Sequence, residues 1–181
     1  DNSALEKAIS TIEKNVDRQV TKGIIAANDK ATLLSNITTH TDLNTGIADA
    51  DLIIEAATEN SIIKKKIFAE MDKYAKPNCI LATNTSSISI GELAAATQRP
   101  SQVIGMHFMN PVPVMKLVEV INSKETDPLV TKTIISLTEQ LGKIPCVVND
   151  FPGFLANRIL MPMINEAIIA LSEGVSDAST I

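Results

Sequence analysis

The stretch Gly105-Met-His-Phe-Met-Asn-Pro-Val-Pro-Val-Met-Lys-Leu-Val-Glu-Val-Ile121 decides both the fold and the candidate site of this chain. It continues an apolar run that begins at Val103, and a short apolar run of this kind predicts a buried strand of a parallel sheet at 103–106. His107 follows this strand directly. Because open α/β sheets bind ligands at the carboxyl ends of their strands, we expect His107 to face a ligand crevice.

Glu119 is the second residue of interest, because it interrupts another apolar run, which predicts a strand at 116–121. Burying an unpaired carboxylate costs free energy, so a buried Glu119 needs a partner. A carboxylate that holds one ring nitrogen of His107 leaves the other nitrogen free to act as a base. The pattern leaves a second interpretation open, in which His107 is an ordinary polar residue and Glu119 points to solvent.

Composition limits the function classes. The 181 residues give room for one domain and the start of a second. Sixteen basic and 21 acidic residues give a net charge of −5 without long runs of either sign, which disfavours nucleic acid and anionic membranes as partners. We interpret Cys79 and Cys146 as buried thiols, since both lie in apolar runs. The chain has no signal peptide and no run long enough to span a bilayer, so we expect a soluble, cytoplasmic protein.

Hydrophobic periodicity and breaker residues predict an alternation of strands and helices. The strands are predicted at 51–57, 79–83, 103–106, 116–121 and 144–149, with a short β-prone run at 37–40 that ends in a surface histidine, His40. The helices are predicted at 3–22, 29–34, 61–75, after the capping box that begins at Ser89, between Asp127 and Gly142, and at 154–173. Strand 116–121 follows a non-helical link and is expected to run antiparallel, and Pro145 places strand 144–149 near an edge.

The last predicted helix, 154–173, is apolar on more than one side. We therefore expect it to be buried in a helical second domain or a dimer, with a kink at Pro162.

Polar residues follow three successive predicted strands. They are Glu59 and Asn60 after the first, Asn84 and Ser86 after the second, and His107 and Asn110 after the third. Because the carboxyl ends of parallel strands meet at one edge of a sheet, three such ends in a row predict a shared ligand site. Helix caps at Asn60 and Ser87 would account for part of this polarity.

Three motifs carry a family resemblance: Ala82-Thr-Asn-Thr-Ser-Ser87, the long stretch 105–121, and Pro152-Gly-Phe-Leu-Ala-Asn-Arg158. The chain resembles the L-3-hydroxyacyl-CoA dehydrogenases over its whole length, specifically the short bacterial 3-hydroxybutyryl-CoA dehydrogenase type. The resemblance implies an α/β fold with a Rossmann-type, mostly parallel sheet. It also implies an NAD-binding domain at 1–150 and, at 151–181, the start of an all-helical domain through which the protein forms a homodimer.

The resemblance implies an NAD-dependent oxidation of a (S)-3-hydroxyacyl-CoA, such as 3-hydroxybutyryl-CoA, to the 3-oxoacyl-CoA, or the reverse reduction. NADP is not excluded by the residues present. In this family pattern His107 is the catalytic base and Glu119 orients it, while Ser86 and Asn157 bind the substrate oxygen. A neutral donor can polarise that oxygen without competing for its proton.

The same resemblance assigns cofactor contacts to Glu59, Lys64, Ser86 and Asn110. Lys22 falls near the position of the lysine that binds the phosphate of CoA in this family.

The chain departs from the family pattern in one respect. None of its seven glycines forms the Gly-x-Gly-x-x-Gly turn that admits the pyrophosphate of a dinucleotide. We therefore expect a fragment that lacks the first strand-helix-strand and most of the helical domain, and that alone lacks normal NAD affinity. Two alternatives stay open, a non-catalytic relative that keeps the fold as a binding module and a dehydrogenase for a non-CoA 3-hydroxy acid.

Overall fold

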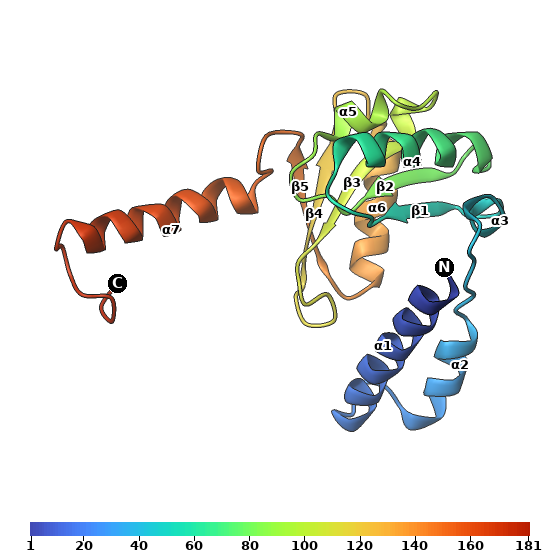
Figure 1. The fold of residues 1–181 in the computed structure, drawn as a ribbon, viewed down its shortest axis with the longest axis horizontal. Helices are drawn as coiled ribbons and strands as arrows, with labels where there is room; N and C mark the ends of the chain where they lie inside the picture. The colour runs from blue at the N-terminus through green and yellow to red at the C-terminus, as the bar shows by residue number, and fades with distance from the viewer. The chain divides into compact units, whose positions relative to one another are not determined.

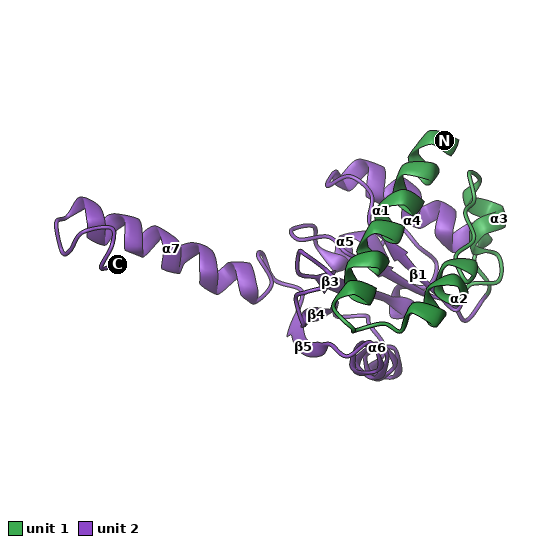
Figure 2. Cartoon of the chain, turned by 90° about the horizontal axis from the view of Figure 1, so that it is seen from below, with its two compact units in different colours: residues 1–50, 74–76 green, residues 51–73, 77–181 purple.

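The computed structural model describes residues 1–181. The chain divides into two compact units, one of residues 1–50 and 74–76 and the other of residues 51–73 and 77–181 (Figure 2). Figure 1 labels the helices and strands in chain order.

The first unit is helical and consists of α1 (Asn2–Thr21), the 3₁₀ turn η1 (Ala27–Asp29), α2 (Lys30–Ser35) and α3 (Leu43–Ile47). Asp1 caps α1, because its side chain accepts a hydrogen bond from the amide of Ala4 at 2.8 Å. An ion pair between Asp17 and Lys30 joins α1 to α2. Among the residues of α1, Val16 is buried.

The β-prone run at 37–40 does not form a strand, since these residues are in neither helix nor strand. The first unit contains no strand with which this segment could pair, and an isolated β-prone run gains no ladder hydrogen bonds. His40 is exposed, as expected.

The second unit is built on a five-stranded sheet whose spatial order is the chain order. The strands are β1 (Leu52–Glu55), β2 (Ile80–Thr83), β3 (Val103–Phe108), β4 (Leu117–Asn122) and β5 (Ile144–Asn149). The first three are parallel, β4 runs antiparallel to β3, and β5 is parallel to β4 at the edge. This arrangement confirms the predicted Rossmann-type, mostly parallel sheet, including the reversed fourth strand.

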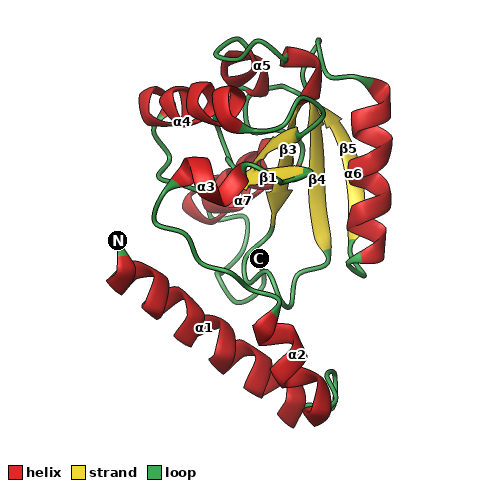
Figure 3. Ribbon diagram, turned by 90° about the vertical axis from the view of Figure 1, so that its right-hand side faces the viewer, coloured by secondary structure: helices red, strands yellow, loops and turns green.

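Helices cover both faces of this sheet, with α4 (Ser61–Tyr74) and α5 (Ile90–Ala94) on one side and α6 (Pro128–Gln140) on the other (Figure 3). Under α6 the core is aliphatic, and its members are Ala82, Ile104, Met106, Val118, Val120, Val130 and Ile134. A sheet buried on both faces explains why the central strands read as continuous apolar runs rather than as alternating ones.

The helix caps follow the sequence with one exception. Asn60 caps α4, Ser89 accepts from the amide of Glu92 at 3.3 Å at the start of α5, and Asp127 accepts from Leu129 at 2.7 Å at the start of α6. The cap expected at Ser87 is wrong. Its side chain and amide bind the carboxylate of Glu59 instead.

The helix α7 (Ala156–Ser172) has no buried residue, although most of its side chains are apolar. Figure 2 shows that it stands apart from the sheet of its own unit. The burial expected for this helix is therefore not provided by residues 1–181, because no other element packs along it beyond its first turns. None of the helices is both long and apolar enough to cross a membrane.

Gly105 supplies the first testable prediction, because a Cβ at this position would lie 2.8 Å from the Cβ of Ile121 on the paired strand. We expect Gly105→Ala to reduce the free energy of unfolding by about 1–3 kcal/mol, the usual range for overpacking a core. Denaturant-induced unfolding measures this change.

The matched control is Gly91→Ala in α5, whose added Cβ would find its nearest neighbour at an ordinary 3.5 Å. Alanine at this helical position should leave stability equal or raise it. Equal unfolding free energies for both variants would contradict the prediction.

Candidate active site

The pairing of β3 with β4 places His107 directly opposite Glu119. The ring nitrogen Nδ1 of His107 lies 2.9 Å from Oε2 of Glu119. Glu119 is 1 % exposed and His107 6 %, so this hydrogen bond is shielded from water. Of the two interpretations that the sequence left open, the buried pair is confirmed.

The other ring nitrogen of His107, Nε2, lies 2.9 Å from the hydroxyl of Ser86, which follows β2. A carboxylate only accepts hydrogen bonds, so in the neutral ring Nδ1 carries the proton and Nε2 is an acceptor. The hydroxyl of Ser86 then donates to Nε2. Glu119, His107 and Ser86 form one continuous chain of hydrogen bonds from the core to an exposed serine.

The second oxygen of Glu119 is also used. Oε1 accepts hydrogen bonds from the amides of Leu155 and Ala156 at 2.9 Å and 2.8 Å. These amides stand at the start of α7, where unpaired N–H groups and the helix dipole favour a negative charge. The buried carboxylate is thus satisfied on both sides, and it fixes the start of α7 next to the histidine.

Asn157 is the second residue of α7 and is half-buried. The residue before it, Ala156, donates its amide to Glu119, so Asn157 begins next to this carboxylate. No hydrogen bond joins Asn157 to His107 or Ser86. Its expected contact with the substrate oxygen stays a prediction.

Phe154 is a site residue that sequence reasoning missed. Its ring lies edge-on to the imidazole of His107, with the centroids 6.0 Å apart at an interplanar angle of 61°. Phe154 is 5 % exposed and has a φ of 48°, a left-handed conformation that is uncommon outside glycine. The motif at 152–158 contains this residue, but only the left-handed turn directs its ring toward the histidine.

Glu59 organises the turn that carries Ser86. Its Oε1 accepts from the hydroxyls of Thr85 and Ser87 at 2.5 Å and 2.8 Å, and from the amides of Ser86 and Ser87 at 3.0 Å and 3.2 Å. Burial opposes ionisation of this carboxyl. The hydrogen bonds from Thr85, Ser87 and Ser86 and the charge of Lys64 outweigh that effect and hold the pKa of Glu59 below its usual range.

Lys64 is buried, with 1 % of its side chain exposed. Its ammonium lies 2.7 Å and 2.8 Å from the two carboxylate oxygens of Glu55 and 3.7 Å from Oε2 of Glu59. The cofactor contact expected of Lys64 stays a prediction, and its observed partners are the two carboxylates and the carbonyl of Ala57.

Two further expected site residues are exposed. Asn110 lies beyond β3, before a cis peptide bond to Pro111. Lys22 is the C-cap residue of α1 and belongs to the first unit. Their contacts with cofactor and CoA stay predictions.

The residues at the carboxyl ends of β1, β2 and β3 fit part of a dinucleotide. Glu59 keeps 44 % of its side chain exposed, so its Oε2 can accept a hydrogen bond from a ribose hydroxyl. Ser86 and Asn110 expose a hydroxyl and an amide on the two neighbouring strand ends. The glycine-rich turn for the pyrophosphate is not among residues 1–181, so no phosphate contact is assigned to this chain.

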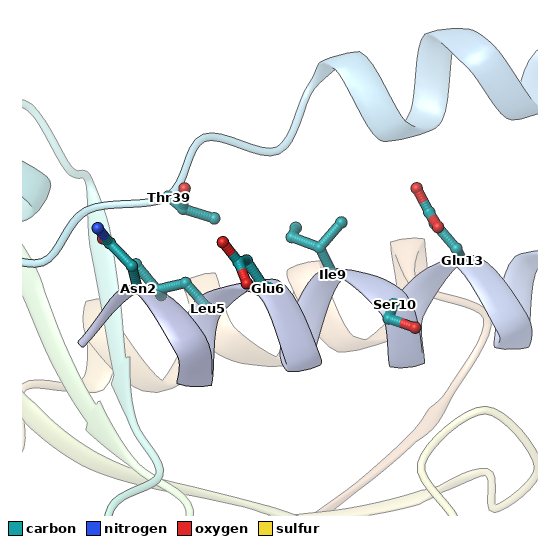
Figure 4. Close-up of a pocket in the computed structure, with 7 residues that line it drawn as sticks. All are labelled: Asn2, Leu5, Glu6, Ile9, Ser10, Glu13 and Thr39. Carbon is teal, nitrogen blue, oxygen red and sulfur yellow. The ribbon is translucent and has the colours of Figure 1, made fainter.

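A separate cleft of about 390 Å³ lies within the first unit. It is lined by Asn2, Leu5, Glu6, Ile9, Ser10, Glu13 and Thr39 (Figure 4). Its charged side chains, Glu6 and Glu13, are both acidic. The cleft therefore does not suit the phosphates of NAD or CoA.

A histidine held by a buried carboxylate at the ends of parallel strands defines the class, that of the nucleotide-binding α/β domains of dehydrogenases. Comparison with known proteins makes this specific. Residues 1–151 match the family described as "3-hydroxyacyl-CoA dehydrogenase, NAD binding domain". The chain belongs to this family, which confirms the resemblance and supports NAD as its cofactor.

Several relatives match nearly the whole chain. A 3-hydroxybutyryl-CoA dehydrogenase of Clostridioides difficile is 46 % identical over 98 % of this chain and 63 % of its own length. The mitochondrial hydroxyacyl-coenzyme A dehydrogenase of Homo sapiens is 41 % identical over 97 % of this chain and 57 % of its own length.

Among solved structures, the (S)-3-hydroxybutyryl-CoA dehydrogenase PaaH1 of Ralstonia eutropha is 44 % identical, with a TM-score of 0.94 over all of this chain and 64 % of its own. The chain thus spans less than two thirds of the relatives that it matches.

The lowered pKa of Glu59 gives a pH prediction. A carboxyl whose pKa is lower in the folded state adds stability above its unfolded-state pKa, and this stability is lost as the pH falls through the folded value. We expect the amides of Ser86 and Ser87 to lose protection from hydrogen exchange in this acidic range. Glu59→Gln should lower their protection at neutral pH as well.

Hydrogen exchange followed by NMR measures this effect. The control is Glu92→Gln, which removes an exposed ion pair with Lys65 and should leave both amides protected. Unchanged exchange in Glu59→Gln would contradict the role assigned to this carboxylate.

Proposed function

We propose that the natural polypeptide catalyses the NAD-dependent oxidation of a (S)-3-hydroxyacyl-CoA, 3-hydroxybutyryl-CoA in particular, to the 3-oxoacyl-CoA, and the reverse reduction. Family membership supports the reaction class. The observation that carries the proposal is the hydrogen-bonded chain Glu119–His107–Ser86, which presents an imidazole nitrogen at the ligand edge of the sheet.

In the oxidation, the 3-hydroxyl of the substrate donates its proton to Nε2 of His107. The O–H bonding electrons form the C=O bond while hydride leaves C3, and bound NAD supplies the hydride acceptor. Glu119 stabilises the imidazolium through Nδ1, at the observed 2.9 Å. In the reduction, the imidazolium returns the proton to the forming alkoxide.

Ser86 and Asn157 are proposed to bind the substrate oxygen, and Ser86 is already in hydrogen-bond contact with Nε2. An oxygen placed between the two groups would receive a hydrogen bond from Ser86 and give its proton to His107. Glu59, Ser86 and Asn110 are proposed cofactor contacts, because all three are exposed at the strand ends. Lys64 and Lys22 are carried over from the family resemblance alone.

Residues 1–150 are proposed to belong to the NAD-binding domain and residues 151–181 to the start of a helical domain. The apolar side chains exposed along α7 support burial against further protein, and we propose that this burial includes a second copy of the chain. The cytoplasmic location stays a prediction.

The central test is His107→Gln in the natural polypeptide. We expect kcat for acetoacetyl-CoA-dependent NADH oxidation to fall by about 10²–10⁴-fold, the usual contribution of a general acid or base. Steady-state kinetics measure this loss. The control is His40→Gln, which changes the exposed second histidine and should keep kcat. Activity without dependence on CoA, or an unaffected His107→Gln, would overturn the proposal.

Glu119→Gln tests the orientation of the ring. If the side-chain oxygen of the new glutamine keeps the hydrogen bonds from the backbone amides of Leu155 and Ala156, its NH₂ group faces His107. This NH₂ group can only donate, so Nδ1 must become an acceptor. The proton then moves to Nε2, and the base is lost. We expect kcat for 3-hydroxybutyryl-CoA oxidation to fall by roughly 10²-fold or more.

The tautomer can be observed directly by ¹⁵N NMR of the imidazole of His107. Retained kcat together with a proton still on Nδ1 would show that Glu119 does not set the tautomer.

A further inference from the structure

The buried pair of Glu55 and Lys64 has no contact with the histidine, yet it lies next to Glu59, which binds the turn that presents Ser86. Side-chain exposure is 2 % for Glu55 and 1 % for Lys64. Removing two charges from water is costly, and a buried ion pair is by itself weak evidence for a stabilising role. The contacts of these two residues indicate a different role.

Glu55 is fixed to the sheet. Its Oε2 accepts from the hydroxyl of Thr83 at the end of β2 at 2.8 Å, and its Oε1 accepts from the amide of Ala57 at 2.5 Å. Lys64 adds two bonds to the same carboxylate and a third, at 3.2 Å, to the carbonyl of Ala57. The ammonium is therefore held at a defined point beside the ends of β1 and β2.

The carboxylate of Glu59 lies at a longer distance, with Oε2 3.7 Å from this ammonium. Its second oxygen takes four donors from Thr85, Ser86 and Ser87. Hydrogen bonds from the turn contribute more than the charge of Lys64 to the lowered pKa of Glu59. Glu59 is thus bound mainly to the turn, and Lys64 mainly to Glu55.

We propose that Glu55 and Lys64 are positioning residues for Ser86. Glu55 retains the ammonium of Lys64, which leaves Glu59 on the turn of residues 85–87 and keeps the hydroxyl of Ser86 at Nε2 of His107. Without the charge of Glu55, the ammonium moves to Glu59, its one remaining carboxylate, and competes with the donors of the turn. Lys64 acts on the turn through these carboxylates.

The effect on turnover rests on the proposed function, whereas the effect on the turn does not. In Glu55→Gln we expect hydrogen exchange at Ser86 and Ser87 to become about tenfold faster, because charge-assisted hydrogen bonds weaken. We expect kcat with acetoacetyl-CoA and NADH to fall by about tenfold at a nearly unchanged KM, since only the placement of the reacting oxygen is disturbed. Both are measured on the natural polypeptide.

The decisive variant is the double substitution Glu55→Gln/Lys64→Met, which removes both buried charges and leaves no unpaired ion. With no ammonium to compete, Glu59 returns to the turn, so the exchange rates of Ser86 and Ser87 should recover toward the wild-type values. Lys65→Met is the matched control, since the neighbouring lysine forms only an exposed ion pair with Glu92.

The outcomes separate the two proposals. Wild-type exchange and kcat in Glu55→Gln, with or without a lower melting temperature, would assign the pair a purely structural role and overturn the inference. A double variant whose amides at Ser86 and Ser87 exchange as fast as in Glu55→Gln would also overturn it, because the ammonium would not be the cause. A wild-type protein without acyl-CoA turnover would overturn the proposed function alone, and the exchange rates would still decide the role of Glu55.

Discussion

The double use of the Glu119 carboxylate is the constraint on which the candidate site depends. An ionised carboxylate in the core is tolerated only when its oxygens are bonded, and here one oxygen meets His107 while the other meets two amides at the start of α7. The same group therefore sets the tautomer of the histidine and the point at which the last helix begins. Neither task could move to another residue without leaving a buried charge unpaired.

The register of two antiparallel strands makes this arrangement possible. Side chains on a strand alternate between the two faces of the sheet, so a slip of one residue would turn Glu119 to the opposite face from His107. The link at 109–116 reverses the chain without a crossover helix, and His107 and Glu119 then become direct cross-strand neighbours. The strands and the reversal could be predicted from the sequence. The sequence could not distinguish a Glu119 paired with His107 from a Glu119 that faces solvent, because apolar runs define strands but not their register.

Other features lay outside the reach of sequence patterns for identifiable reasons. The position of the Phe154 ring depends on a left-handed backbone conformation, which periodicity does not encode. The burial of Lys64 contradicts the usual behaviour of lysine, and only the three-dimensional approach of Glu55 makes it possible. The β-prone run at 37–40 failed as a strand because propensity is local, whereas a strand exists only beside a partner. Long elements with explicit caps, such as α6 after Asp127, could be predicted well because their signals are local.

Two carboxylates hold the two ends of the hydrogen bond between Ser86 and His107. Glu119 fixes the imidazole from within the core, and Glu59 fixes the serine through the turn after β2. The distance from Ser86 to Nε2 is thus determined by two anchors, Glu119 on β4 and Glu59 in the loop after β1, and backbone donors restrain both side chains. For a reaction whose protein-supplied chemistry is proton transfer and orientation, such restraint is what a positioned base requires. The buried ammonium beside Glu59 belongs to the same arrangement, because a carboxylate can hold a turn only while no mobile cation takes its oxygens.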